Sequence, residues 1–187
     1  MTQAPTIETP RLILRAFRAD DVETFCAQMA NDAFAMFITR EGRGLSHGES
    51  WQRFCSMAGH WVARGYGNFA VEEKASGAFI GHLGPMNPPG WPAFEIGWGI
   101  FPDYQGKGYA TEGAAAAFRW AHEALGQQET LHMIDDSNEG SQKVARALGA
   151  EPGEMWTPFW PEPKPVRKWR TTWDAFTASQ AYARLTA

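Results

Sequence analysis

An eleven-residue stretch, DYQGKGYATEG at residues 103–113, has the residue types of an anion-binding loop. It lies between an apolar run that alternates like a strand and an alanine-rich run with helical spacing. Gly106 and Gly108 permit positive φ and leave room beside the backbone. The amides of residues 105–110 can then converge at the N-terminus of the following helix, where unpaired N–H groups and the helix dipole favour negative charge. The spacing predicts a pyrophosphate seat; the alternative is a tight turn that needs glycine only for its shape.

Two common phosphate-binding motifs do not fit this stretch. A P-loop needs GxxxxGK followed by Ser or Thr, whereas Lys107 is followed by Gly108 and the first glycine is missing. A dinucleotide fingerprint needs GxGxxG, but counting from Gly106 the last position is Thr111. The pattern that remains is Q-x-x-G-x-A at residues 105–110.

The apolar run before the glycine loop, FEIGWGIF at residues 94–101, carries one carboxylate. Alternate side chains of a strand share a face, so Glu95 lies with Gly97, Gly99 and Phe101, opposite the apolar set. A ligand can lie over the two glycines with Glu95 beside it. The alternative is an exposed glutamate on the solvent face of an edge strand.

The surrounding elements are predicted from hydrophobic periodicity and from turn residues. Residues 40–50 are expected to form a loop, and a last amphipathic segment begins at residue 178. The order of elements, with hairpins in the middle and a strand–loop–helix–strand unit after them, predicts an α+β fold with a mixed, mostly antiparallel central sheet and helices on both faces. We expect strands over 11–17, 68–74, 77–86, 93–101, 130–135, 155–160 and 166–176, and helices from residue 20 or 21 to 30 and over 50–65, 110–125 and 141–149.

Length and composition limit the classes of protein to consider. The 187 residues, 44% of them hydrophobic, suit one domain spanning 1–187. A formal charge of −4 argues against a nucleic-acid binder. Cys26 and Cys55 form no CxxC pattern or disulfide framework and are interpreted as buried thiols, and no metal-ligand spacing is present. No apolar run is long enough for a signal peptide or a membrane span, so we expect a cytoplasmic protein without a membrane partner.

Three segments of the chain together resemble the GCN5-related N-acetyltransferase (GNAT) superfamily. The pattern at residues 105–110 is similar to the superfamily's Q/R-x-x-G-x-G/A signature. The opening ETPRLILRAFRADDVETF and the central FEIGWGIFPDYQGKGYATEGAAAAFRWA resemble the subgroup that includes the ribosomal-protein N-terminal acetyltransferases. NEGSQKVARALGA resembles that subgroup's N-x-x-S…L-G-F segment, with Ala150 where an aromatic residue is usual. The resemblance covers nearly the whole chain and implies a GNAT-like fold.

The resemblance implies acetyl-CoA as the cosubstrate. It implies that the main chain of Ile100 and Phe101 pairs with the pantetheine like an added strand. Asn138 is expected to contact the pantetheine, and its alternative role is that of an ordinary loop or capping residue. Glu95 matches the position of the family's glutamate base. The pyrophosphate is expected on the main-chain amides of the glycine loop, which belong to Gln105, Gly106, Lys107, Gly108, Tyr109 and Ala110.

Acetyl transfer to an amine needs a neutral nucleophile and a proton for the leaving thiolate. A lysine-type amine is neutral about once in 10³ at pH 7 and an α-amino group about once in ten, so a base helps. The family's donor to the thioester carbonyl is usually a main-chain amide on the same strand, here near Ile100. Many members protonate the thiolate with a tyrosine seven residues after the position of Asn138, where this chain has Ala145. Ser141 is the remaining candidate; its alternative role is to cap the following helix.

The sequence leaves the acceptor amine open. The segments 36–66, 86–92 and 153–173 are expected to line its entrance, as an apolar pocket or a cation–π site for an ammonium group. A protein N-terminus, a small amine and an aminoglycoside-like antibiotic all fit, in a monomer or a homodimer. The aromatic residues of this region, part of which belong to the core, are Phe34, Phe37, Trp51, Trp61, Trp91, Trp156, Phe159 and Trp160.

Two other classes of function stay open at this point. The chain can be a non-catalytic acyl-CoA-binding or sensor module, which the absence of a tyrosine at Ala145 suits and the presence of Glu95 does not. It can also bind a different nucleotide, such as ATP or NAD, through the same glycine loop.

Overall fold

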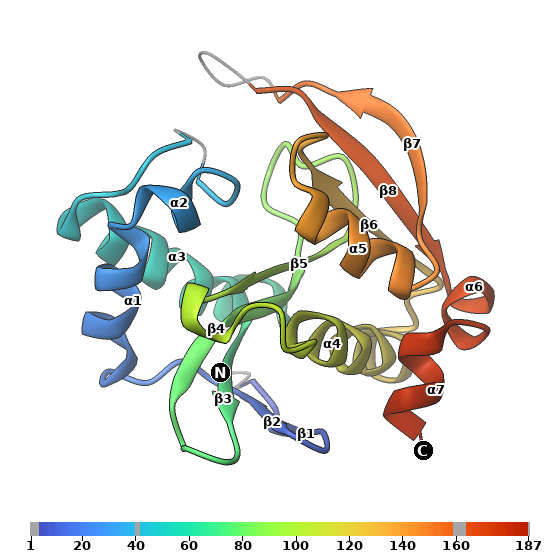
Figure 1. Cartoon of the computed structure of the whole chain (residues 1–187), viewed down its shortest axis with the longest axis horizontal. Coiled ribbons are helices and arrows are strands. Elements are labelled where there is room, and N and C mark those ends of the chain that lie inside the picture. Colours follow the sequence, from blue (N-terminus) through green and yellow to red (C-terminus); the bar gives the residue numbers. More distant parts are fainter. Residues whose placement is uncertain (1–3, 40–41, 159–163, 187) are drawn as a thin grey trace.

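The computed structural model describes residues 4–39, 42–158 and 164–186. These residues form an eight-stranded sheet with the order β1-β2-β3-β4-β5-β6-β8-β7. Figure 1 shows the sheet passing through the middle of the molecule with helices packed against it. The strands are β1 (Ile7–Glu8), β2 (Leu12–Arg15), β3 (Phe69–Glu73), β4 (Phe79–Met86), β5 (Glu95–Ile100), β6 (Glu129–Ile134), β7 (Glu151–Trp156) and β8 (Val166–Thr172).

Neighbouring strands are antiparallel in every pair of this sheet except β5–β6. The hairpins β3–β4 and β4–β5 are those expected from the spacing of the apolar runs, and they place His82 between Ala70 and Gly99. Strands β5 and β6 run parallel and share the register pair Glu95↔Leu131. The prediction of a mixed, mostly antiparallel sheet is confirmed.

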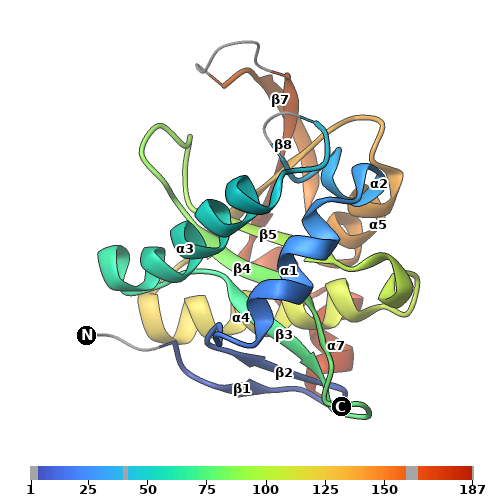
Figure 2. The ribbon, with the colours of Figure 1, turned by 90° about the vertical axis from the view of Figure 1, so that its left-hand side faces the viewer.

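Helices cover both faces of the sheet. Figure 2 shows α1 and α3 in front of β4 and β5, with α4 lying on the far side. Two neighbouring residues of the chain show the division: Ile100 packs in one apolar core with Phe118 of α4, whereas Phe101 packs in another with Phe25 of α1 and Phe54 of α3. The helices are α1 (Asp21–Met29), α2 (Asp32–Ala35), α3 (His47–Arg64), α4 (Tyr109–Leu125), α5 (Glu139–Ala147), α6 (Trp173–Thr177) and α7 (Gln180–Thr186), with a short 3-10 turn η1 (Pro102–Tyr104).

Helix α3 begins three residues earlier than the apolar spacing indicated. Ser46 is its N-cap, and a capping box joins the Ser46 side chain to the Glu49 amide and the Glu49 side chain to the Ser46 amide. The expected loop over 40–50 is therefore wrong in its second half. The helix ends, as expected, at Gly65, which has φ +76° and closes the last turn on Trp61 O.

The C-terminal part differs most from the sequence-based prediction. The expected strand over 166–176 ends at Thr172, because the Thr172 side chain caps α6 by accepting from the Ala175 amide. The strand expected over 155–160 begins earlier, at Glu151, and residues 159–160 lie outside the described residues. Strand β1 and helix α2 were not predicted at all.

Three further observations bear on the classes of function. Cys26 is buried, but Cys55 is exposed, so its interpretation as a buried thiol is wrong. Within the described ranges, no helix combines the length and the apolar character needed to span a bilayer. The same part of the chain holds no group of three or more His, Cys, Asp or Glu residues placed to bind a metal ion.

Candidate active site

Strands β5 and β6 share one register pair, and side chains occupy the places of the next main-chain bonds. The main-chain ladder reaches the bond from Leu131 N to Phe94 O, at 3.0 Å. The next amide of β6 on this side, Met133 N, donates instead to Glu95 Oε1 at 3.0 Å. Ile96 O bonds to the ring nitrogen Nδ1 of His132 at 2.7 Å instead of to a main-chain amide. The side chains of Glu95 and His132 thus replace the main-chain bonds between the two strands. Beyond them, the side of β5 that faces β6 has main-chain groups that β6 does not pair with.

The main-chain groups that face this gap are those of Trp98 and Ile100. Phe101 N donates to Ile80 O of β4, and amide directions alternate along a strand, so even-numbered residues of β5 point away from β4. Both main-chain groups of Phe101 are bonded inside the protein, since Phe101 O accepts from Tyr104 N. The expected added-strand pairing therefore has the amide of Ile100 available but not that of Phe101. Ile100 O is already held by Gln105 Nε2 at 2.8 Å.

The glycine loop has the backbone shape of an anion seat. Gly106 and Gly108 have φ +74° and +82°, and Gly108 is the N-cap of α4. The amide of Glu112 donates to Gly108 O, so the amides before it belong to the first turn, which an α-helix leaves without intrahelical acceptors. The amide of Gln105 is not among them, because it closes η1 on Pro102 O at 3.1 Å. The amides from Gly106 to Ala110 thus remain as the candidate seat, with the positive end of the helix dipole behind them.

Arg11, in the turn between β1 and β2, braces this loop. Its Nη1 donates to Lys107 O at 2.9 Å, and its Nε donates to Glu112 Oε2 at 2.7 Å. The guanidinium also lies over the Tyr109 ring, 4.7 Å from the centroid. Thr9 Oγ1 donates to the other oxygen of the Glu112 carboxylate. Sequence reasoning missed this brace, although Arg11 lies inside the opening segment that carries the family resemblance.

Glu95 is buried, with 5% of its surface exposed, and both carboxylate oxygens accept hydrogen bonds. Oε1 accepts from Met133 N, and Oε2 accepts from the indole Nε1 of Trp91 at 2.5 Å. Burial raises the pKa of Glu95 to about 7, against the opposing effect of the two N–H donors. The alternative of an exposed glutamate on an edge strand is excluded, because β5 is a central strand. A carboxyl that titrates near neutral pH is suited to general acid–base work.

The two glycines beside Glu95 differ in their surroundings. A Cβ added at Gly97 would meet only the Glu95 carboxylate within 4 Å, with Oε1 at 3.7 Å, so this position is open and lies on the Glu95 face. A Cβ at Gly99 would lie 2.9 Å from His82 Cε1 and 3.4 Å from Phe34 Cζ. The space over Gly99 is therefore filled by protein, and of the two expected positions only Gly97 is open to a ligand.

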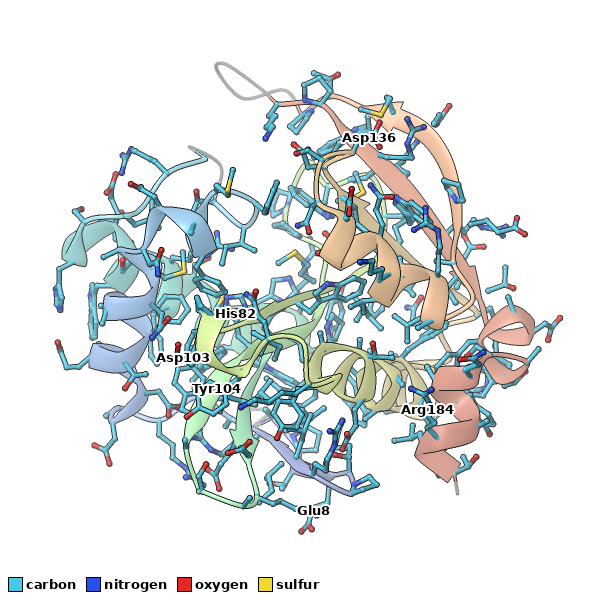
Figure 3. The ribbon with its side chains drawn as sticks, viewed as in Figure 1. Glu8, His82, Asp103, Tyr104, Asp136 and Arg184 are labelled. Carbon is cyan, nitrogen blue, oxygen red and sulfur yellow. The ribbon has the colours of Figure 1, made fainter. Side chains whose placement is uncertain are left out.

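His82 and His132 are both buried. Burial lowers the pKa of His82 to about 3, and the pKa of His132 to about 4, so both are neutral near pH 7. Figure 3 labels His82 at the boundary between the blue helices and the sheet, with Asp103 and Tyr104 on the η1 turn below it. Both ring nitrogens of His82 lack a hydrogen-bond partner among the described residues.

Asn138 and Ser141 lie at the start of α5. Asn138 is the N-cap, and its side-chain oxygen accepts from the Ser141 amide at 3.0 Å, so the capping role belongs to Asn138 and not to Ser141. Trp98 Nε1 lies 3.2 Å from Ser141 Oγ. An indole nitrogen only donates, so Ser141 accepts there and keeps its own hydroxyl proton for another acceptor. Ala145 is fully buried, in a cluster with Ile134, Ala150 and Trp169.

The aromatic residues expected at the acceptor entrance include both core residues and more exposed ones. Phe34 and Trp61 are buried in the two cores, whereas Trp51 of α3 is half exposed. Trp91 lies edge-on to Trp156 of β7, with ring centroids 5.4 Å apart. Phe159 and Trp160 fall outside the described residues.

Acidic side chains at the end of β6 and on β7 form ion pairs. Asp135 pairs with Lys164 at 2.6 Å, and Asp136 pairs with Arg167 at 2.7 Å. Figure 3 labels Asp136 beside β8, near the end of the β7–β8 hairpin. Glu154 pairs with Lys168, and Lys164 Nζ also lies 5.7 Å from the centroid of the Phe37 ring. The charges of these carboxylates are therefore compensated within the chain.

Comparison with known proteins gives this arrangement a family. The model of the acetyltransferase (GNAT) domain matches residues 11–151. A Bacillus subtilis (strain 168) protein described as uncharacterized N-acetyltransferase YnaD is 30% identical over 143 residues, which cover 76% of this chain and 81% of that protein. This chain belongs to the GNAT acetyltransferase family.

Solved structures agree with the family at the level of the fold. The structure of an acetyltransferase from Agrobacterium tumefaciens str. C58 matches with a TM-score of 0.78 and 27% identity, covering 90% of this chain and 95% of that one. Spermidine N-acetyltransferase from Vibrio cholerae, in complex with CoA and spermine, matches with a TM-score of 0.69 and 18% identity, covering 88% and 97%. The ribosomal-protein-S5-alanine acetyltransferase from Vibrio fischeri matches with a TM-score of 0.71 and 19% identity, covering 92% of this chain and 99% of that one.

Proposed function

We propose that this chain transfers the acetyl group of acetyl-CoA to the nitrogen of a primary amine, by direct attack while both substrates are bound. The observation that carries the proposal is the buried carboxyl of Glu95, placed where β5 and β6 separate. Its pKa, raised to about 7 by burial, suits a base that takes a proton from the amine, directly or through water. The proposal treats residues 1–187 as one catalytic domain.

The glycine loop fits the pyrophosphate of acetyl-CoA, which supplies the activated acetyl group as a thioester. A Cβ added at Gly106 would meet nothing within 4 Å, so the loop is open beside its amides. In the proposal the amides of Gly106, Lys107, Gly108, Tyr109 and Ala110 hold the pyrophosphate. Gln105 contributes through its side chain, which fixes the carbonyl of Ile100 next to the gap.

The main-chain edge of β5 and the start of α5 serve the rest of the cosubstrate. The amides of Trp98 and Ile100 face the gap, where they can pair with the pantetheine and polarise the thioester carbonyl. Phe101 acts through core packing, since its main chain is bonded within the protein. The side-chain NH₂ of Asn138 is left for the pantetheine, because its oxygen is used to cap α5.

The proton path follows from the two polar side chains beside the gap. The amine nitrogen attacks the carbonyl carbon, the C–S bond breaks, and Glu95 accepts the proton that the nitrogen loses. Ser141 donates its hydroxyl proton to the leaving sulfur and takes a proton back from solvent, to which Glu95 releases its own, while the bond from Trp98 Nε1 holds the Ser141 oxygen in place. Water is the alternative donor to the sulfur.

The acceptor is a protein N-terminus or a small-molecule amine. The resemblance to the ribosomal-protein N-terminal acetyltransferases favours a peptide N-terminus. A polyamine needs several uncompensated carboxylates near the site, whereas Asp135 and Asp136 are ion-paired in this chain. An α-amino group, with a pKa near 8, also gives up its proton to a weaker base than a lysine-type amine with a pKa near 10.4 requires.

One observation favours a second function, a non-catalytic acyl-CoA sensor. Ala145 stands where many family members carry the tyrosine acid, and it is fully buried among apolar side chains. A sensor would bind acetyl-CoA through the same loop without transfer. The buried carboxyl of Glu95 is a costly group to retain in such a module, because it is desolvated and pairs with no cation among the described residues.

The experiment pairs ligand binding with turnover. Acetyl-CoA and CoA at about 100 times their Kd should each stabilise the fold by about 2.7 kcal/mol, whereas ATP and NAD should not. Glu95→Gln should reduce thiol release with a panel of amines and peptide N-termini about 100-fold, with an unchanged Kd for CoA. Binding without turnover in the wild type would select the sensor, and stabilisation by none of the four ligands would remove the proposal.

A further inference from the structure

The loop 87–94, between β4 and β5, folds back so that Trp91 lies against the first residue of β5. A main-chain bond from Trp91 N to Pro88 O, at 3.0 Å, closes a turn in this loop. Pro88, Pro89 and Pro92 restrict the backbone of the segment. The indole Nε1 of Trp91 then reaches Glu95 Oε2 at 2.5 Å.

We infer that Trp91 is the positioning residue for the Glu95 carboxylate, so that the acceptor-side loop 87–94 sets both the orientation and the proton affinity of the base. The inference rests on the proposed function, in which Glu95 is that base. An indole N–H only donates, so this bond is strongest when the carboxyl is ionised. Together with Met133 N, it fixes one donor on each carboxylate oxygen, and each oxygen keeps a further lone pair for the incoming amine or a water.

Another tryptophan of the chain shows the ordinary structural use of an indole N–H. Trp61 donates to the main-chain carbonyl of Asn68 at 2.7 Å, inside a core. Trp91 donates instead to a titratable group that is 5% exposed. A hydrogen bond to the charged form lowers a carboxyl pKa, so Trp91 opposes the rise that burial causes. Removing its N–H must therefore raise the pKa of Glu95 further.

Trp91 also connects the base to β7. Its ring lies edge-on to Trp156, 5.4 Å between centroids, so loop 87–94 bridges Glu95 and the β7–β8 hairpin. An acceptor that contacts the Trp91 ring or the Trp156 ring can therefore affect Glu95 through the hydrogen bond from Trp91 Nε1. This places substrate sensing on the loop, in a segment that carries no titratable side chain of its own.

Among the described residues, three histidines lie on elements next to Glu95 and its loop. His132 of β6 bonds to Ile96 O, next to Glu95 in the chain. The buried His82 of β4 is paired with Gly99 of β5, on the same strand as Glu95. Both are neutral above about pH 5, because burial lowers their pKa values to about 4 and about 3. His60 of α3 is the imidazole in direct contact with loop 87–94, because its Nε2 accepts from the amide of Asn87 at the start of the loop.

The test is a ¹⁵N–¹H NMR titration of the indole groups in the full chain, from pH 5 to pH 9, with no acceptor present. The Trp91 resonance is assigned by its loss in Trp91→Phe. It should move with one midpoint near pH 7 in the wild type, and it should stay fixed in Glu95→Gln. The Trp61 resonance, whose acceptor does not titrate, is the internal control. In His60→Gln, which removes the imidazole in contact with loop 87–94, the Trp91 resonance should still titrate.

A kinetic measurement gives the functional half of the test. In Trp91→Phe the acid limb of the kcat/KM profile should move up by about one pH unit, which lowers activity about fivefold at pH 7 and leaves the plateau above pH 9 unchanged. Trp120→Phe, a matched change at a partly buried tryptophan of α4, should leave the profile in place. A purely structural role would lower the plateau and keep the midpoint.

The outcomes separate the inference from the proposed function. A Trp91 resonance that does not titrate, or titrates equally in Glu95→Gln, overturns the inference, even where Glu95→Gln abolishes turnover and so supports the proposed function. The opposite result is also possible. If the Trp91 resonance titrates in the wild type but not in Glu95→Gln, and Glu95→Gln keeps full turnover, the Trp91–Glu95 contact stands and the base role of Glu95 is overturned.

Discussion

The carboxylate of Glu95 bonds to the main-chain amide of Met133 at 3.0 Å, in the place where a parallel ladder between β5 and β6 would otherwise continue. The same side chain therefore takes the place of a main-chain bond between the strands and lies where the gap between them begins. A buried carboxyl also leaves a signature in stability, so its protonation can be measured without knowledge of the substrate.

The free energy of unfolding should carry a Glu95 contribution that falls as pH rises. Burial raises the pKa of Glu95 from its ordinary 4.5 to about 7 in the folded chain. Between these values the folded state holds a proton that the unfolded state has released, so the folded state loses stability with increasing pH. The contribution is complete below pH 4.5 and is lost above pH 7, and it amounts to about 3 kcal/mol.

Urea unfolding of the wild type and of Glu95→Gln at pH 5 and pH 8 measures this contribution. His82 and His132 have lowered pKa values and act in the opposite direction, so the quantity to compare is the difference between the two proteins at each pH. Glu95→Gln should gain stability relative to the wild type by about 3 kcal/mol on going from pH 5 to pH 8. A difference that is the same at both pH values would show that Glu95 does not titrate in this range.

The brace from Arg11 to the glycine loop should control affinity for CoA. Arg11 holds Lys107 O and neutralises Glu112, whose carboxylate otherwise lies in the first turn of α4 beside the proposed pyrophosphate seat. Arg11→Gln should weaken CoA binding about threefold to tenfold, because the seat loses a support and gains an uncompensated negative charge. Isothermal titration with CoA measures the effect.

A second variant separates the two causes. Arg11→Gln with Glu112→Gln restores the charge balance without the brace, so it should recover part of the lost affinity. Arg119→Gln is the matched control, since Arg119 pairs with Glu123 at 2.8 Å on the same helix but away from the loop. Equal affinity in all of these proteins would mean that the brace has no part in CoA binding.

The central sheet could be predicted from the sequence because its signals are local. Alternation over 68–101 and the glycines and prolines between the runs define β3, β4 and β5, and the alanine-rich run defines α4. The missed elements depend on contacts that the sequence does not show. Strand β1 has two residues, and its pairing with β2 fixes it. Thr172 ends β8 by capping α6, although the residues around it have the pattern of a continuing strand.

The candidate site was predictable in residue types but not in how the groups are used. Glycine spacing indicates the amide seat, and alternation puts Glu95 on the right face. Sequence alone does not show that Gln105 and Phe101 use their amides internally, since that depends on η1 and on the register with β4. The indole of Trp91 reaches Glu95 through the shape of loop 87–94, which periodicity does not describe.

Ser141 should affect the chemical step and leave CoA binding unchanged. Its hydroxyl accepts from Trp98 Nε1, so its proton is free for the leaving sulfur in the proposed mechanism. Ser141→Ala should lower kcat about tenfold to 100-fold with the same Kd for CoA, because only the developing thiolate uses that proton. Ser137→Ala, a change in the preceding loop at a hydroxyl bonded to Asp135, should have no such effect. An unchanged kcat in Ser141→Ala would assign the sulfur's proton to water.

His82 should be a residue whose removal stabilises the fold. It is 4% exposed, both ring nitrogens lack partners among the described residues, and the centroid of the Phe25 ring lies 5.6 Å from that of His82. A buried polar group without a partner costs about 1–3 kcal/mol, so His82→Leu should raise the free energy of unfolding by that order at pH 7.

The matched comparison is His132→Leu. His132 is equally buried, but its nitrogens bond to Ile96 O at 2.7 Å and Thr171 Oγ1 at 3.0 Å, so the same substitution there leaves buried partners unpaired and should destabilise the fold. Urea unfolding of both variants at one pH, with CD detection, gives the two signs directly. If His82→Leu lost as much stability as His132→Leu, the description of His82 as a costly buried group without a partner would be wrong.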